Sequence, residues 1–222
     1  MVETTASHCV VSTSLEITRV VWPAGQEIHR IHLDIYAADD FNPGVRGNAR
    51  FSPIQSSTKV AIPTLYGGDT FDCAAMETVF HDVPFTGGLK QHDKNRLAGH
   101  IYSKLKPQAD LTLVDLSVVA LRNLGIRRAQ LIDTDSTHYP MTRAWAKAFH
   151  SQFSDVQGLQ WISRQDDRAR AIILFGDRIK KSDLLDAGDS RNILADSATY
   201  ANILVLARTI GVFLVDGRAA HP

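Results

Sequence analysis

Cysteine is scarce in this chain: only Cys9 and Cys73 occur among 222 residues, and they lie far apart. A disulfide framework needs several cysteines at regular spacings, so the sequence excludes a small disulfide-stapled scaffold. Cys73 falls within an apolar helical pattern, where a free thiol packs as a small hydrophobic side chain. Ordinary apolar burial must therefore stabilise the fold.

An excess of charge and a long hydrophobic run are also missing. The 24 Lys and Arg residues balance 24 Asp and Glu residues, so no overall field attracts a phosphate polymer or an anionic membrane. The most apolar stretch, residues 201–215, is shorter than a membrane span and contains Arg208. The first residues lack the basic start and apolar run of a signal peptide. We therefore expect a cytoplasmic protein with no direct nucleic-acid or membrane partner.

Several common catalytic motifs are absent. The chain has no G-x-G-x-x-G fingerprint, no Walker loop and no G-x-S-x-G nucleophile elbow. His29 and His32 are three residues apart, but no H-E-x-x-H motif or Cys/His quartet accompanies them. Positions on a strand or turn explain these histidines, and we predict neither a metal nor a bound cofactor.

The organisation of the chain indicates one compact domain. No stretch is long enough or rich enough in Pro, Gly and Ser to act as a linker. Residues 1–14 are predicted to be a disordered N-terminus, and residues 15–218 to form the domain. The predicted elements do not alternate as in a doubly wound sheet, so we expect an α+β fold with a mixed, mostly antiparallel sheet flanked by helices.

Hydrophobic alternation and β-branched residues predict the strands, and capping residues delimit the helices. The predicted strands are residues 15–21, 29–33, 59–66, 111–116, 159–163, 171–175 and 212–215. The predicted helices are residues 69–83 with Asp69 or Thr70 as cap, 117–124, 137–153 and about 192–210. Residues 159–163 and 171–175 should form a hairpin. Residues 84–107 are the least regular region, predicted as a loop followed by a short helix.

Three short segments in order resemble a known family. They are residues 47–52 (Gly-Asn-Ala-Arg-Phe-Ser), 63–68 (Pro-Thr-Leu-Tyr-Gly-Gly) and 74–80 (Ala-Ala-Met-Glu-Thr-Val-Phe). Together they resemble the bacterial RES domain family, which is named for its Arg, Glu and Ser. Arg50, Tyr66 and Glu77 occupy the family's positions for Arg, Tyr and Glu.

The resemblance covers residues 19–175 and leaves a helical extension at residues 190–210 unmatched. Its downstream segments are residues 113–117, 139–146, 158–164 and 171–175, and they place the family's Ser at Ser163. The segment between Arg50 and Tyr66 is longer than usual in the family, and Ser52 stands where Asn is common. Arg46 is therefore the alternative to Arg50.

The resemblance implies an enzyme with an ADP-ribosyltransferase-like fold that degrades NAD at the bond between nicotinamide and ribose. NAD is then a substrate, and water or inorganic phosphate is the acceptor. Breaking this bond gives the ribose oxocarbenium character and releases neutral nicotinamide, so the leaving group needs no general acid. The reaction instead needs a carboxylate near the ribose, where the positive charge develops.

The resemblance assigns four residues to the catalytic site, and each has a simpler alternative. Glu77 would orient the ribose hydroxyls and stabilise positive charge, but it fits a solvated helix residue too. Arg50 would bind the pyrophosphate or an incoming phosphate, or form a surface ion pair. Tyr66 would stack on nicotinamide or ribose, or pack in the core. Ser163 would bind a ribose or phosphate oxygen, or be an inert turn serine.

Three further residues are predicted to contact the substrate. Phe51 is expected in the cavity wall, and Tyr139 and Arg164 are expected to add polar contacts. The alternative for each is a purely structural role.

Three functions follow from the resemblance. The first is an NAD phosphorylase or glycohydrolase that acts as the toxin of a toxin–antitoxin pair, inhibited by a partner with a helix-turn-helix domain. The second is a transferase that moves ADP-ribose to a protein, and the third is a catalytically silent binding module. A homo-oligomer is compatible with each of them.

Overall fold

The structure is a computed structural model that describes residues 11–188 and 190–217. Cys9 and residues 1–10 of the predicted disordered segment lie outside the described residues. Within that segment, the carbonyl of Ser12 accepts a hydrogen bond of 3.0 Å from Gln152. In the described part of the chain, no helix combines the length and hydrophobicity needed to cross a membrane.

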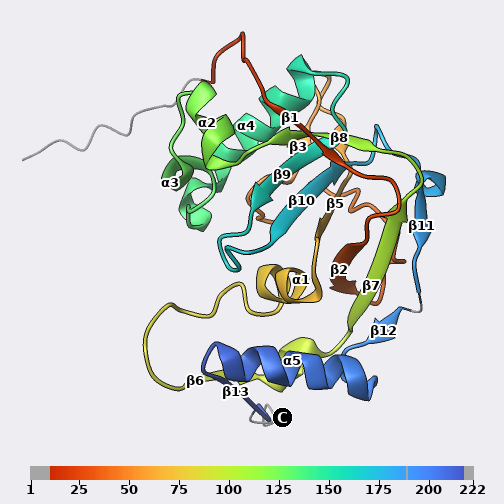
Figure 1. Ribbon diagram of the computed structural model, residues 1–222, viewed down its shortest axis with the longest axis vertical. Coiled ribbons are helices and arrows are strands. Elements are labelled where there is room, and N and C mark those ends of the chain that lie inside the picture. Colours follow the sequence, from red (N-terminus) through yellow and green to blue (C-terminus); the bar gives the residue numbers. More distant parts are fainter. Residues whose placement is uncertain (1–10, 189, 218–222) are drawn as a thin grey trace, which may run out of the picture.

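A nine-stranded sheet forms the centre of the molecule (Figure 1). Its strands are β1 (Arg19–Trp22), β2 (Ile28–Leu33), β5 (Thr64–Gly68), β7 (His100–Pro107), β8 (Leu111–Asp115), β9 (Gly158–Ile162), β10 (Arg170–Phe175), β11 (Leu184–Asp186) and β12 (Arg191–Asn192). The order is β1-β8-β9-β10-β5-β2-β7-β11, and β12 also pairs with β7. Among the strand pairs that the described residues form in this sheet, only β8–β9 is parallel. The predicted α+β fold with a mixed, mostly antiparallel sheet is confirmed.

Helices and two small sheets surround this central sheet. The helices are α1 (Phe71–Thr78), α2 (Val118–Asn123), α3 (Arg128–Leu131), α4 (Tyr139–Gln152) and α5 (Ser197–Thr209). The small sheets pair β3 (Ile54–Gln55) with β4 (Ala61–Ile62), and β6 (Lys90–Asp93) with β13 (Val212–Val215). Figure 1 shows α2, α3 and α4 gathered near β8 and β9, whereas α5 lies with β6 and β13 at the opposite end.

The core lies on both faces of the sheet because successive side chains of a strand point to opposite sides. In β10, Ile173 and Phe175 join the cluster that contains Phe149 of α4, whereas Ile172 and Leu174 join the cluster on the other face. All of these side chains are fully buried, and each contributes roughly 1.5–3 kcal/mol. A third cluster joins α1 to α5. These contacts fix α1 against the edge of the cavity described below.

Local signals located many elements correctly. The hairpin of β9 and β10 is confirmed, as are β2, β8 and β13. Ser117 caps α2 through its side chain, and Gly125 after this helix has a φ of 68°. Pro140 lies in the first turn of α4, as predicted.

The prediction for residues 84–107 was wrong in its second half. A short 3-10 helix does form at Lys94–Leu97, but His100–Pro107 then forms the eight-residue strand β7 beside β2. Ser103, Leu105 and Pro107 alternate inward, while Lys104 and Lys106 point outward to Glu27. The lysines made this segment resemble a loop, because its strand character depends on a partner distant in sequence.

Three predicted boundaries also needed correction. Residues 59–66 are not one strand, because Pro63 lacks an N–H and separates β4 from β5. Helix α1 ends at Thr78 and not near Val83, since the backbone turns to bury Phe80 in the third cluster. Helix α5 begins at Ser197 and not near Asn192, because Asp196 caps its first turn.

The close pairing of β9 and β10 predicts a large effect of Gly158→Ala. A Cβ at this glycine would lie 2.1 Å from the carbonyl oxygen of Ile173, so the strands would have to separate. We expect the free energy of unfolding to fall by about 3 kcal/mol in urea denaturation. Gly87→Ala is the control, since no heavy atom lies within 4 Å of its added Cβ. Equal midpoints for the two variants would contradict this prediction.

Candidate active site

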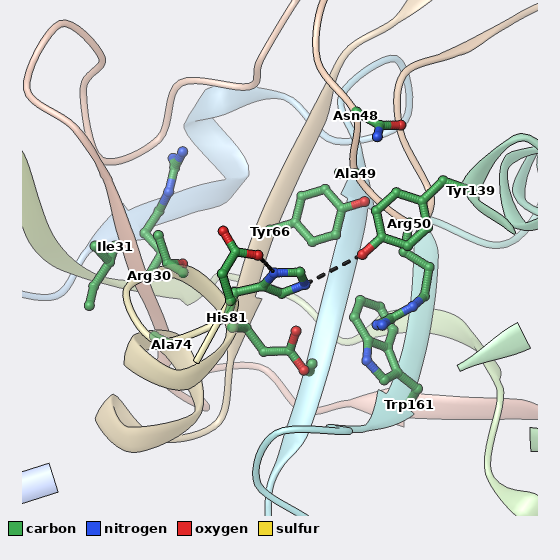
Figure 2. A pocket seen from close by; sticks show the side chains of 15 residues that line it. Arg30, Ile31, Asn48, Ala49, Arg50, Tyr66, Ala74, His81, Tyr139 and Trp161 are labelled. Atoms are coloured by element: carbon green, nitrogen blue, oxygen red, sulfur yellow. Dashed lines mark hydrogen bonds and ion pairs between the residues drawn. The ribbon is translucent and has the colours of Figure 1, made fainter. Parts of the chain in front are cut away.

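A cavity of about 350 Å³ opens beside the end of α1 (Figure 2). This volume lies within the range of cavities that bind small molecules. The lining side chains that matter chemically are Arg30, Arg50, Tyr66, Glu77, His81, Tyr139 and Trp161. They come from β2, the segment before β3, β5, α1 and the residues after it, α4 and β9.

Glu77 is the carboxylate in this cavity that has a fixed orientation. Thr70 caps α1 by accepting a hydrogen bond of 3.0 Å from the N–H of Cys73, and the buried Cys73 anchors the helix in the core. The hydroxyl of Ser163 donates to Glu77 Oε1 over 2.6 Å. The carboxylate therefore reaches the cavity on a helix fixed at both ends.

Ser163 supports Glu77 from behind and does not line the cavity. Its side chain is 0% exposed, and its Oγ accepts hydrogen bonds of 3.0 Å from the N–H groups of Gln165 and Asp166. Two accepted bonds leave the hydroxyl proton for Glu77. Ser163 is thus a positioning residue in this structure, and the predicted bond to a ribose or phosphate oxygen is not formed by its present geometry.

The geometry predicts two effects of Ser163→Ala. Loss of the hydroxyl leaves two N–H groups of the turn unpaired and should lower the free energy of unfolding by about 1–3 kcal/mol. It also releases Glu77 to other rotamers, so we expect turnover to fall about 10-fold to 100-fold with a smaller change in KM. Ser163→Thr, which keeps the hydroxyl, is the comparison. A variant with altered stability and unchanged turnover would show that Ser163 serves only the turn.

Arg50 brings a buried positive charge to the cavity. Its side chain is 5% exposed, and the Thr142 hydroxyl donates to its carbonyl oxygen. The guanidinium lies over the Tyr139 ring, with Cζ 5.8 Å from the ring centroid. Within residues 11–188 and 190–217, Arg50 forms no ion pair, and its buried Nε has no hydrogen-bond partner. Since an uncompensated buried charge is costly, the geometry suits an anionic ligand.

Arg30 adds a second buried cation that the sequence analysis missed. Its side chain is 8% exposed and donates to the carbonyl of Asp40 over 3.0 Å. Burial lowers the pKa of Arg30 to about 10, an effect partly opposed by the nearby carboxylates of Asp40 and Asp39. Arg30 is therefore protonated at neutral pH. Residues two apart on a strand point to the same side, so Arg30 shares the face of β2 that carries the buried Ile28, and Figure 2 shows its guanidinium directed away from Arg50 and His81.

Aromatic side chains form much of the remaining wall. Tyr66 accepts a hydrogen bond of 3.1 Å from the N–H of Phe51, and burial raises the pKa of Tyr66 to about 12. Its hydroxyl therefore stays protonated at neutral pH. Trp161 contacts Tyr66 edge to face, with ring centroids 6.4 Å apart. Figure 2 shows Tyr139 facing His81 across the cavity, and their polar atoms lie 3.4 Å apart.

Two predicted substrate contacts lie elsewhere. Phe51 is fully buried and packs edge to face on Trp161 at 5.1 Å, so it supports the wall from the core and does not form it. Arg164 donates to the carbonyl of Thr134 and does not line the cavity. Arg46, the alternative to Arg50, is exposed and outside this cavity. Arg50, Tyr66, Glu77 and Tyr139 are the predicted residues that the fold brings together.

His81 is another site residue that the sequence analysis missed. It lies four positions after Glu77, a spacing that places two residues on one face of a helix. The predicted helix to Val83 already contained this signal. The observed helix ends earlier, and His81 reaches the cavity from the turn that follows.

The structure thus describes a single α+β domain whose cavity combines an oriented carboxylate, Glu77, with a buried arginine, Arg50, the type of site found in enzymes that act on anionic ligands. The family model of the RES domain matches residues 27–193, and the chain belongs to the RES domain family. No curated protein matches the sequence. Family membership is consistent with an enzyme that acts on NAD and with a toxin–antitoxin association. Within the described residues, no group of three His, Cys, Asp or Glu could hold a metal ion.

Proposed function

We propose that this protein degrades NAD by cleaving the bond between nicotinamide and ribose, as a phosphorylase or a glycohydrolase. The observation that carries this proposal is the Glu77 carboxylate, held by the buried Ser163 hydroxyl at 2.6 Å in a cavity that also contains Arg50. The site thus offers negative charge for the ribose and positive charge for the phosphates of one dinucleotide.

The reaction uses these charges in a defined order. The bond between C1′ and the nicotinamide nitrogen breaks, and its electron pair leaves with the nitrogen, which becomes neutral. Glu77 binds the ribose hydroxyls and stabilises the positive charge that develops on the sugar. An oxygen of water or phosphate then forms the new bond to C1′.

Arg50 suits the pyrophosphate of the same substrate. It lines the cavity, and the described chain offers it no carboxylate within ion-pair distance. A guanidinium binds phosphate oxygens through two parallel N–H donors, which fixes orientation as well as charge. Tyr66 and Trp161 supply an apolar surface for the nicotinamide ring.

The proposed biological setting is the bacterial cytoplasm, where NAD is available. There the protein would act as a toxin, and an antitoxin with a helix-turn-helix domain would inhibit it. This part of the proposal rests on family membership.

Incubation of the purified protein with NAD, with and without inorganic phosphate, tests the proposed function. We expect nicotinamide release by mass spectrometry, with ADP-ribose as the second product in water and its phosphate ester when phosphate is the acceptor. Labelled protein without free ADP-ribose would favour a transferase. No nicotinamide release and no thermal shift with millimolar NAD would favour a binding module and reject the proposal.

A further inference from the structure

His81 lies in the same cavity as Glu77, and the turn that follows β9 holds both residues in place. The side chain of Gln165 donates a hydrogen bond of 2.9 Å to the carbonyl of His81. The backbone N–H of Gln165 binds the Ser163 hydroxyl, which in turn binds Glu77. The turn after β9 therefore positions both side chains, and their relative placement is a built feature of the site.

The neighbours of His81 determine which ring nitrogen carries the proton. Nδ1 lies 2.9 Å from the Asp82 carboxylate, an acceptor-only group, so in the neutral ring Nδ1 carries the proton and Nε2 keeps its lone pair. The Asp82 side chain is 82% exposed, which limits it to selecting this tautomer. Figure 2 shows Nε2 on the side of the ring that faces Tyr139.

The contact between His81 Nε2 and the Tyr139 hydroxyl is long, at 3.4 Å. A hydrogen bond of this length is weak. A water or phosphate that enters the cavity can therefore take the place of the Tyr139 hydroxyl at Nε2. Tyr139 is 3% exposed, so a molecule bound to this nitrogen would lie beside a buried tyrosine and be shielded from bulk solvent. A basic nitrogen thus borders the space available to a nucleophile.

Water and phosphate differ in what they require from the enzyme. A water that bonds to C1′ must lose a proton, whereas hydrogen phosphate attacks through an oxygen that is already anionic. Hydrolysis therefore benefits from a general base near the water, and phosphorolysis does not.

We propose that His81 is the general base of NAD hydrolysis at this site. Its Nε2 takes one proton as a water oxygen bonds to C1′ and the bond from C1′ to nicotinamide breaks. The products are ADP-ribose, nicotinamide and protonated His81, which returns the proton to solvent. This inference rests on the proposed function and adds that the protein hydrolyses NAD when phosphate is absent.

The experiment compares His81→Gln with the wild-type protein at saturating NAD, with and without inorganic phosphate. We expect hydrolysis to fall about 100-fold, the usual order for a lost general base, while phosphorolysis changes less than about threefold. The unchanged phosphorolysis also shows that the variant is folded. His138→Gln is the matched control, because His138 forms a similar pair with Asp135 at 3.0 Å but does not line the cavity.

The pH profile gives a second readout. A general base must be unprotonated to accept a proton, so wild-type hydrolysis should fall on acidification and His81→Gln should lose this dependence. The charged and titratable groups that line the cavity with His81 are Arg30, Arg50, Tyr66, Glu77, Asp82 and Tyr139.

Two results would overturn the inference: equal hydrolysis by His81→Gln and the wild type, or a wild type that releases nicotinamide only when phosphate is present. Both differ from failure of the proposed function, in which the wild-type protein releases no nicotinamide in either buffer.

Discussion

Glu77→Gln is expected to reduce nicotinamide release about 1000-fold in both the presence and the absence of phosphate. Glutamine has nearly the same shape and can still accept the hydrogen bond from Ser163, but it carries no negative charge. The variant therefore removes the electrostatic stabilisation of the developing oxocarbenium ion and leaves the cavity in place. Removal of one such preorganised group in other enzymes costs about 2.7–4 kcal/mol of transition-state stabilisation, which is consistent with this factor.

Nicotinamide release under single-turnover conditions measures this effect directly. Asp72→Asn is the matched control, because Asp72 lies in the first turn of the same helix and does not line the cavity. Its loss removes a favourable interaction with the helix dipole, about 0.3–1 kcal/mol, and should leave turnover intact. Comparable turnover by Glu77→Gln and the wild type would exclude Glu77 from the chemistry.

Arg50→Met is expected to weaken NAD binding without lowering the thermal stability of the free protein. The guanidinium is buried, and the described chain offers it no carboxylate, so a methionine of similar length removes an uncompensated charge. We expect the melting temperature of the free protein to stay equal or rise. The affinity for NAD should fall about 100-fold, close to 3 kcal/mol, because charge-assisted hydrogen bonds to the pyrophosphate are lost.

Thermal unfolding with increasing NAD reports both quantities in one experiment. Arg178→Met is the control, since Arg178 donates to the carbonyl oxygens of Phe153 and Val156 and does not line the cavity. We expect this control to lower the melting temperature and keep the NAD-dependent shift. The opposite pattern, a destabilised Arg50→Met with an unchanged shift, would assign Arg50 to the fold and not to the ligand.

Local sequence patterns predicted the elements whose signals lie within a few residues. The hairpin of β9 and β10 is one example, because both segments are rich in apolar residues and the residues between them are mostly polar. Strand β7 is the counterexample: Lys104 and Lys106 alternate with buried residues, and this pattern is stable only beside β2. Pairing between distant segments is therefore the step that local propensity did not supply.

The residues of the site also divide into those that local sequence patterns identified correctly and those whose position depends on contacts between distant segments. The motif segments indicated Arg50, Tyr66 and Glu77 as neighbours, and all three line one cavity. Phe51 and Ser163 were also indicated, but both side chains lie behind the cavity wall. Sequence position alone does not reveal which of two successive residues faces inward when the segment is irregular.

By itself, the sequence determined the class of fold, the absence of a disulfide framework and the residues of the family motifs, because composition and short spacings are properties of the chain. Only the tertiary structure decided what these residues do. Glu77 and Ser163 are 86 positions apart, and their hydrogen bond exists because β10 pairs with both β5 and β9. The burial of Arg50 depends likewise on Tyr139 and Thr142 of α4. Contacts between distant segments set distance, burial and charge, and these quantities define the chemistry of the site.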